Sequence, residues 1–174
     1  TDTIEFINDE FEGSKRILVE GANAAMLDID FGTYPYVTSS NPSVGSVCTG
    51  LGLAPNKISG VFGVVKAYCT RVGEGPFPTE QDGDLGARLR SQGGEYGTTT
   101  GRPRRCGWLD IPQMRFSTKV NGYTHINLTK LDVLTGFPEL KICVGYKYNG
   151  KPMNTMPSNL QVMENLEIQY ETLP

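Results

Sequence analysis

The chain has 174 residues, a length that suits one domain with a real hydrophobic core. Hydrophobic residues make up 38% of it and charged residues 20%, which excludes the class of intrinsically disordered proteins. The net charge of -3 argues against general binding to nucleic acid, and no apolar run approaches the ~20 residues of a membrane span.

The 21 glycines and 11 prolines occur without a repeat, so they indicate many tight loops between short buried strands. Near the N-terminus, apolar residues at 4, 6, 7 and 11 predict a helix that ends at Gly13. Residues 16–21 form an apolar run into a glycine turn, which predicts a short buried strand with a ligand at its end. Residues 33–42 predict a loop, and the glycines at 45, 50 and 52 are expected to prolong this irregular stretch.

In the remainder of the chain, short apolar runs again alternate with polar or glycine-rich loops. The predicted elements are a strand over 64–72, a loop over 73–78, a short helix over 85–90, a long polar loop over 93–105, and strands over 128–134 and 141–148. Asn149-Gly150 is a hairpin turn signal, so residues 151–156 are expected to form the partner strand. No internal boundary resembles a linker. The expected fold is therefore α/β, with a mixed, largely parallel sheet and long glycine-rich loops, in one domain.

The four cysteines are far apart and form no CxxC pair, so zinc and redox motifs are unsupported and mostly buried, reduced thiols of a cytoplasmic protein are expected. His125 is the only histidine, and without a catalytic motif around it we interpret it as a partly buried polar residue. The first residues lack the features of a signal peptide and an initiator Met. Together with the abrupt end at Pro174, this suggests a piece excised from a longer chain.

The most informative stretch is residues 97–105, with the sequence GTTTGRPRR. Its glycines let the backbone turn, its threonines offer hydroxyl donors, and its arginines add bidentate forks for carboxylate or phosphate. A solvated basic turn that pairs with nearby acids is the alternative.

A second motif, LTKLD at 128–132, places Lys130 and Asp132 after an apolar strand. One carboxylate can accept the N1 and N2 hydrogens of guanine, a donor pair that adenine lacks, although an ordinary salt bridge at a strand end is the alternative. A third stretch, EGAN at 20–23, precedes a loop whose amide and hydroxyl groups can meet a ligand. Asp28 and Asp30 in this stretch are expected to cap turns, and general bases or metal ligands are the alternative roles for them.

Taken together, these stretches resemble the adenylosuccinate synthetase family over nearly all of the chain. The matching strings are 19–41, 66–73, 75–80, 97–108 and 128–134. Asn23, where some members carry Gln, resembles the eukaryotic branch. The resemblance implies a ligase that uses GTP and magnesium to join IMP to L-aspartate, first phosphorylating the 6-oxygen of IMP and then letting the aspartate amine displace the phosphate.

The resemblance also implies that residues 1–174 are the central substrate-binding segment of a larger single-domain enzyme. That enzyme is expected to be a cytoplasmic homodimer that binds neither nucleic acid nor membrane. The implied contacts are Asn23, Thr38, Val72 and Arg102 for IMP, then Thr98, Thr99, Thr100, Gly101, Arg102, Pro103 and Arg104 for aspartate, and Arg104, Lys130, Leu131 and Asp132 for GTP.

Several family features have no match in this sequence, namely the glycine-rich phosphate loop, the catalytic aspartate and the catalytic histidine. Catalytic residues and magnesium ligands are therefore expected outside the segment, and the segment alone is expected to be inactive. Pro103 stands where other members can carry arginine and is expected to stiffen the loop without removing Arg102 or Arg104. A non-catalytic nucleotide-binding or regulatory module derived from this family, and a plain structural domain, stay open as alternatives.

Overall fold

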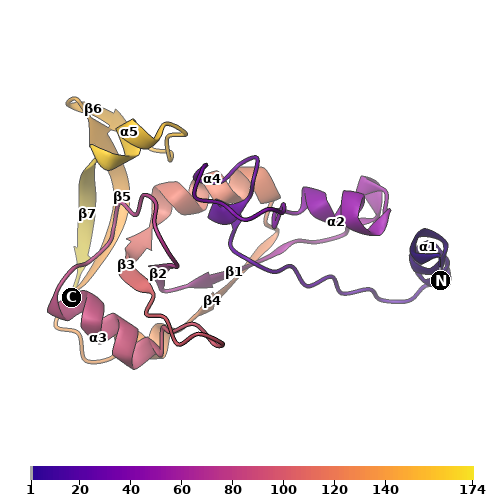
Figure 1. The fold of residues 1–174 in the computed structure, drawn as a ribbon, viewed down its shortest axis with the longest axis horizontal. Helices are drawn as coiled ribbons and strands as arrows, with labels where there is room; N and C mark the ends of the chain where they lie inside the picture. The colour runs from indigo at the N-terminus through magenta and orange to yellow at the C-terminus, as the bar shows by residue number, and fades with distance from the viewer. Residues whose placement is uncertain (1) are drawn as a thin grey trace. The chain divides into compact units, whose positions relative to one another are not determined.

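The computed structural model describes residues 2–174, which group into two compact units. The first unit contains residues 2–62 together with Ser117–His125, and the second contains Gly63–Phe116 and Ile126–Pro174. Figure 1 shows helices α1 and α2 in the first unit and a sheet with helices α3 and α5 in the second. The predicted α/β class is confirmed. Among the described residues, no helix is long and apolar enough to cross a membrane.

The first unit consists of helices and turns. Helix α1 (Thr3–Glu12) begins after Asp2, whose carboxylate accepts hydrogen bonds from two backbone N–H groups of the first turn, and it ends at Gly13 as predicted. Helix α2 (Gly45–Leu51) follows later. Two short 3₁₀ turns, η1 (Ala25–Leu27) and η2 (Pro55–Lys57), shape the loops between them.

Two expectations for this unit are wrong. Residues 16–21 form no strand, and Leu18 is 90% exposed, because no described strand lies beside this stretch to pair with its backbone groups. The stretch around residues 45–52 is helical rather than irregular. Its last glycine, Gly52, has a φ of 68°, the left-handed conformation that commonly ends a helix, so this glycine marks a helix terminus and not a loop.

The second unit is built on a five-stranded sheet. Its strands are β2 (Tyr68–Arg71), β3 (Arg105–Asp110), β5 (Leu140–Tyr148), β6 (Lys151–Met153) and β7 (Glu167–Leu173). Strand β5 pairs parallel with β3, whereas β2–β3, β5–β6 and β5–β7 are antiparallel. The sheet is therefore mixed, as predicted, but antiparallel pairs outnumber the one parallel pair. The parallel pair requires a crossover, and helix α4 (Ile111–Asn121) lies on the connection between its strands.

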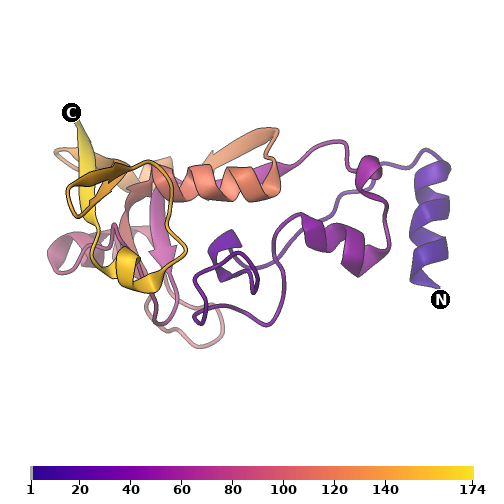
Figure 2. The ribbon, with the colours of Figure 1, turned by 90° about the horizontal axis from the view of Figure 1, so that it is seen from above.

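Helix α3 (Asp84–Gly93) packs against β3 and the 3₁₀ turn η3 (Leu131–Leu134). Their shared core consists of buried side chains from each of these elements and from β2, namely Tyr68, Leu89, Cys106 and Val133. Figure 2 shows α4 and the short helix α5 (Leu160–Glu164) from above. This core fixes the C-terminal end of α3 relative to the sheet, and the candidate site lies at that end.

Two predicted strands are interrupted by single residues. The strand predicted over 64–72 is two strands, β1 (Phe62–Lys66) and β2, which separate at Ala67 and join different sheets, with β1 pairing with β4 (His125–Thr129). The strand predicted over 128–134 ends at Thr129, because Lys130 has a φ of 62° and turns the chain into η3.

The predicted helix over 85–90, the strand over 141–148 and the turn at 149–150 are confirmed within α3, β5 and the β5–β6 hairpin, although β6 ends at Met153. Strands β3 and β7 and helices α4 and α5 were not predicted.

Candidate anion- and nucleotide-binding site

The arginine loop, residues 97–105, leads from α3 into β3, and backbone hydrogen bonds close it. The Gly97 N–H donates to the Arg102 carbonyl at 2.9 Å, and the Gly101 N–H donates to the Gly97 carbonyl at 2.8 Å. Gly101 has a φ of 65°, which only glycine adopts at low cost. Side chains 98–103 are exposed, so the closed turn presents three threonine hydroxyls and one guanidinium to a ligand.

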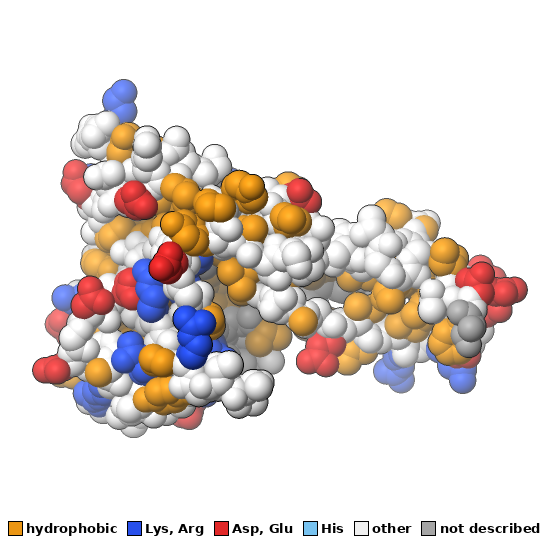
Figure 3. Space-filling model, in the orientation of Figure 1, with side chains coloured by type: hydrophobic (Ala, Val, Ile, Leu, Met, Phe, Trp, Pro, Cys, Tyr) orange, Lys and Arg blue, Asp and Glu red, His pale blue; other side chains and the backbone are white. Residues whose placement is uncertain are grey.

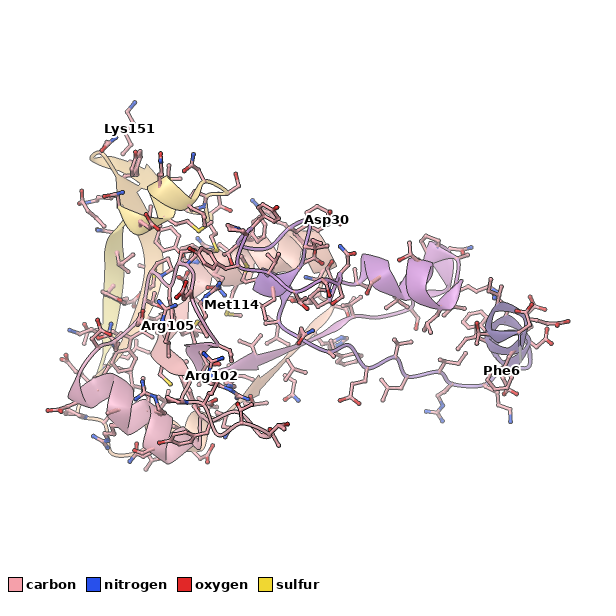
Figure 4. All side chains as sticks on the ribbon, viewed as in Figure 1. Phe6, Asp30, Arg102, Arg105, Met114 and Lys151 are labelled. Carbon is pink, nitrogen blue, oxygen red and sulfur yellow. The ribbon has the colours of Figure 1, made fainter. Side chains whose placement is uncertain are left out.

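The guanidinium of Arg105, the last residue of this loop, is already hydrogen-bonded to other groups of the protein. Its Nε donates to Glu80 at 2.7 Å, and its Nη2 contacts the same carboxylate. Its Nη1 donates to the carbonyls of Gly73 and Gly75. The hydrogen bond to Glu80 raises the pKa of Arg105 further. Arg105 therefore fits the alternative of a basic side chain paired with a nearby acid, and Figure 4 labels it separately from Arg102.

Glu95 lies behind the loop with 1% of its surface exposed. It accepts hydrogen bonds from Lys66 Nζ at 2.8 Å, Tyr68 Oη at 2.6 Å and Arg104 Nη1 at 3.0 Å. Burial alone would raise the pKa of Glu95, but these donors lower it below its ordinary value, so the group is an anion near neutral pH. Two cations share one carboxylate, which leaves this cluster positive and able to attract a negative ligand.

The Lys-x-Asp motif reaches the same end of α3. Lys130 Nζ donates to the carbonyl of Gly93, the last residue of α3, at 2.8 Å. Lys130 thus bonds to a backbone carbonyl rather than forming the strand-end salt bridge considered above. Asp132 lies in the first turn of η3 and is exposed. The structure therefore brings the arginine loop and Lys130 together around residues 93–95, and Figure 3 shows basic side chains gathered over β2, β3 and α3.

Two predicted IMP contacts lie in the first unit. Asn23 is exposed with a φ of 68°, and the backbone N–H of Thr38 donates to Leu27 at 2.8 Å. The third predicted IMP contact in chain order, Val72, follows β2 in the second unit and is 53% exposed. His125 is exposed rather than partly buried, and it stacks on Phe62 with ring centroids 4.8 Å apart.

Asp28 is fully buried and holds the loop that contains Thr38. Its carboxylate accepts hydrogen bonds from the N–H groups of Asp30, Phe31 and Ser43 and from the Ser43 hydroxyl. Burial alone would raise the pKa of Asp28, but these hydrogen bonds lower it. The predicted role of Asp28 in capping turns is confirmed.

Two further features limit the chemistry of the described residues. All four cysteines are free, and of these Cys106 and Cys143 are buried while the other two are half-buried. Among residues 2–174 there is no group of three or more His, Cys, Asp or Glu side chains that could hold a metal ion. Sequence reasoning gave no role to Glu95, Lys66 or Glu80. Lys66 and Glu80 lie at the ends of strings that match the family, but Glu95 lies outside every such string, and a single charged residue carries no local signal of its partners.

Together, the α/β fold, the closed arginine loop and the Lys-x-Asp turn define an α/β protein with a candidate anion-binding site at the C-terminal end of α3. The family model for adenylosuccinate synthetase matches residues 1–174, and the chain belongs to this family of ligases.

Comparisons with individual proteins agree. The adenylosuccinate synthetase of Phaeodactylum tricornutum is 65% identical over 176 residues, which cover 99% of this chain and 34% of that protein. The corresponding protein of Phytophthora infestans is 63% identical, with 99% and 31% covered. A structure described as fully ligated adenylosuccinate synthetase from Plasmodium falciparum superposes with a TM-score of 0.96 at 53% identity, covering 99% of this chain and 42% of that one. The chain therefore spans about a third of the length of the curated relatives it matches.

Proposed function

We propose that the protein containing this chain is an adenylosuccinate synthetase that joins IMP to L-aspartate with GTP as co-substrate. The chain supplies binding surface for all three substrates as the central segment, 1–174, of a larger single-domain enzyme. The observation that carries this proposal is the meeting of the arginine loop and Lys130 at the C-terminal end of α3. An anion-binding loop beside a guanine-type Lys-x-Asp turn is the combination that a GTP-dependent ligase of a dicarboxylic acid requires.

Each group has a role that its chemistry supports. The exposed Arg102 and the Thr98–Thr100 hydroxyls bind the aspartate carboxylates, and Arg104 approaches both aspartate and the GTP phosphates. The Asp132 carboxylate accepts the two guanine donors, with Lys130 and Leu131 beside the base. Asn23, Thr38 and the backbone at Val72 meet IMP, together with Arg102. Holding both reactants lets the aspartate amine face the activated 6-position of IMP without solvent between them.

Other parts of the proposal concern the whole enzyme. Magnesium would be held, and phosphoryl transfer catalysed, by residues outside this chain, and the enzyme would be a homodimer. A cytoplasmic location is proposed, although some relatives, such as that of Physcomitrium patens, carry the name chloroplastic.

The test is coupled turnover with IMP, aspartate, GTP and magnesium, using the full-length protein that contains this chain. We expect adenylosuccinate from the full-length protein and none from the 174-residue segment alone, because phosphoryl transfer depends on positioning by groups from the whole site. Absence of product from the full-length protein, with nucleotide binding retained, would instead support the regulatory-module alternative.

A further inference from the structure

We propose that Glu95 is a positioning residue that holds the Arg104 guanidinium by one nitrogen and leaves its other edge for the aspartate substrate. This inference rests on the proposed function, because it names how one binding side chain of that site is oriented. Glu95 itself touches no substrate. It is buried under the loop and acts through Arg104.

The guanidinium of Arg104 has two edges at which it can donate paired hydrogen bonds. A planar guanidinium offers a side edge formed by Nε and Nη2, and an end formed by Nη1 and Nη2. Glu95 engages Arg104 through Nη1 at 3.0 Å. The Arg104 Nε is buried and has no hydrogen-bond partner among the described residues. A buried N–H without a partner is costly. The Arg104 side chain as a whole is 30% exposed, so a small adjustment of the loop would open the side edge to a carboxylate ligand that accepts from Nε and Nη2 together.

The backbone around Arg104 is fixed in the same way. The Arg104 N–H donates to the Glu95 carbonyl at 3.0 Å, and the Arg104 carbonyl accepts Arg90 Nε at 2.7 Å. Between these residues, Tyr96 and Pro103 form an isolated bridge that closes the base of the loop. Glu95 therefore holds Arg104 by two hydrogen bonds, one to its backbone and one to its side chain. The exposed part of the loop beyond the bridge can still adjust to a ligand.

Charge explains why an anion is needed at this position. Lys66 Nζ lies 2.8 Å from the same Glu95 oxygen that Arg104 contacts. Without the carboxylate, the two cations would repel each other and the guanidinium would turn toward solvent. Glutamine has the same size as glutamate but no charge, so Glu95→Gln removes the negative charge that holds the two cations together and leaves only a weaker, neutral acceptor, without opening a cavity.

The test compares Glu95→Gln with Tyr68→Phe in the full-length enzyme by steady-state kinetics, varying each substrate in turn. Tyr68→Phe removes a different hydrogen bond from the same carboxylate and leaves the Arg104 contact in place, so it is the matched control. We expect Glu95→Gln to raise the KM for aspartate at least about tenfold, with the KM for IMP changed less than about twofold. In Tyr68→Phe the KM for aspartate should stay within about twofold of the wild type, whatever its loss of thermal stability.

A second comparison separates positioning from folding. If Glu95 acts through Arg104, the double variant Glu95→Gln/Arg104→Lys should have the same KM for aspartate as Arg104→Lys alone. Additive effects, an unchanged KM in Glu95→Gln, or an equal rise in Tyr68→Phe would overturn the inference. If Glu95→Gln does not fold, Glu95→Asp withdraws the carboxylate from Arg104 and is judged by the same outcomes. A full-length wild type that makes no adenylosuccinate would overturn the proposed function and this inference together.

Discussion

Arg102 and Arg105 belong to one short loop, yet their surroundings differ. Arg105 binds Glu80 and two backbone carbonyls, whereas Arg102 is exposed. An arginine that is already saturated stabilises the fold, and one without such contacts is available to a ligand. The same Arg→Lys change should therefore have opposite consequences at the two positions.

Arg105→Lys should lower the free energy of unfolding of the full-length protein by about 1–2 kcal/mol, because lysine cannot reproduce the bidentate bond to Glu80. Its KM for aspartate should change little. Arg102→Lys should leave thermal stability unchanged but raise the KM for aspartate or lower kcat strongly, with less effect on the KM for GTP. Thermal melts and steady-state kinetics measure both, and a reversed pattern would assign the ligand to Arg105.

Glu95 also makes stability depend on pH. The donors around Glu95 outweigh burial and lower its pKa below the ordinary 4.5. A lowered folded-state pKa gives stability that is present above the unfolded pKa and is lost as the pH falls through the folded value. The full-length protein should lose stability below about pH 4.5, and Glu95→Gln should be less stable at pH 7 and lose less on acidification. Equal acid sensitivity in wild type and variant, measured by denaturation from pH 7 to pH 3, would contradict this assignment.

At the scale of elements, the C-terminal end of α3 connects the two parts of the candidate site, the arginine loop and the Lys-x-Asp turn. Gly93 closes the helix, its carbonyl binds Lys130, and Glu95 follows two residues later. A Cβ on Gly93 would overlap the hydroxyl of Tyr68 and press on the Glu95 side chain. Both neighbours are buried and bonded to each other, so they cannot move aside easily.

Gly93→Ala should destabilise the full-length protein by about 1–3 kcal/mol through overpacking, although alanine is the better helix former. Gly50→Ala is the control, because Gly50 lies in α2 and a Cβ there meets nothing within 4 Å. That change should stabilise the protein by about 0.5–1 kcal/mol. The free energy of unfolding of both variants, measured with denaturant, tests this prediction. Similar changes at the two glycines would show that the space around Gly93 is not tight.

Local patterns predicted elements that carry a regular signal and failed where one residue changes the path of the chain. The helix before Gly13 and the Asn149-Gly150 hairpin were predictable because their capping and turn residues act locally. The strand predicted through Lys130 failed, since a left-handed lysine leaves no trace in an apolar pattern. The arginine loop and the Lys-x-Asp motif were singled out by their clustered residue types, and the structure places both at the end of α3, while their binding stays a prediction. Glu95 was not, because its partners lie up to 29 residues away in sequence.

At the scale of the whole molecule, the proposed contacts are distributed over both compact units. Asn23 and Thr38 belong to the first unit, whereas the arginine loop and the Lys130–Asp132 turn belong to the second. The chain also spans only about a third of its curated relatives. Binding of the three proposed substrates is therefore to be measured on the full-length protein, and within this segment the proposed guanine contact of Asp132 is tested by the choice of nucleotide base.

The measurement that tests the central claim most directly is nucleotide specificity of Asp132→Asn in the full-length enzyme. The matched control is Asp84→Asn, which changes another exposed acid in the first turn of a helix. The asparagine introduced by Asp132→Asn would lose the acceptor pair for guanine and offer an amide donor to the 2-carbonyl of xanthine, costing GTP about 1.5–3 kcal/mol in kcat/KM and improving use of xanthosine triphosphate. We expect this exchange for Asp132→Asn and wild-type specificity for Asp84→Asn. Unchanged use of GTP with no gain for xanthosine triphosphate would contradict it.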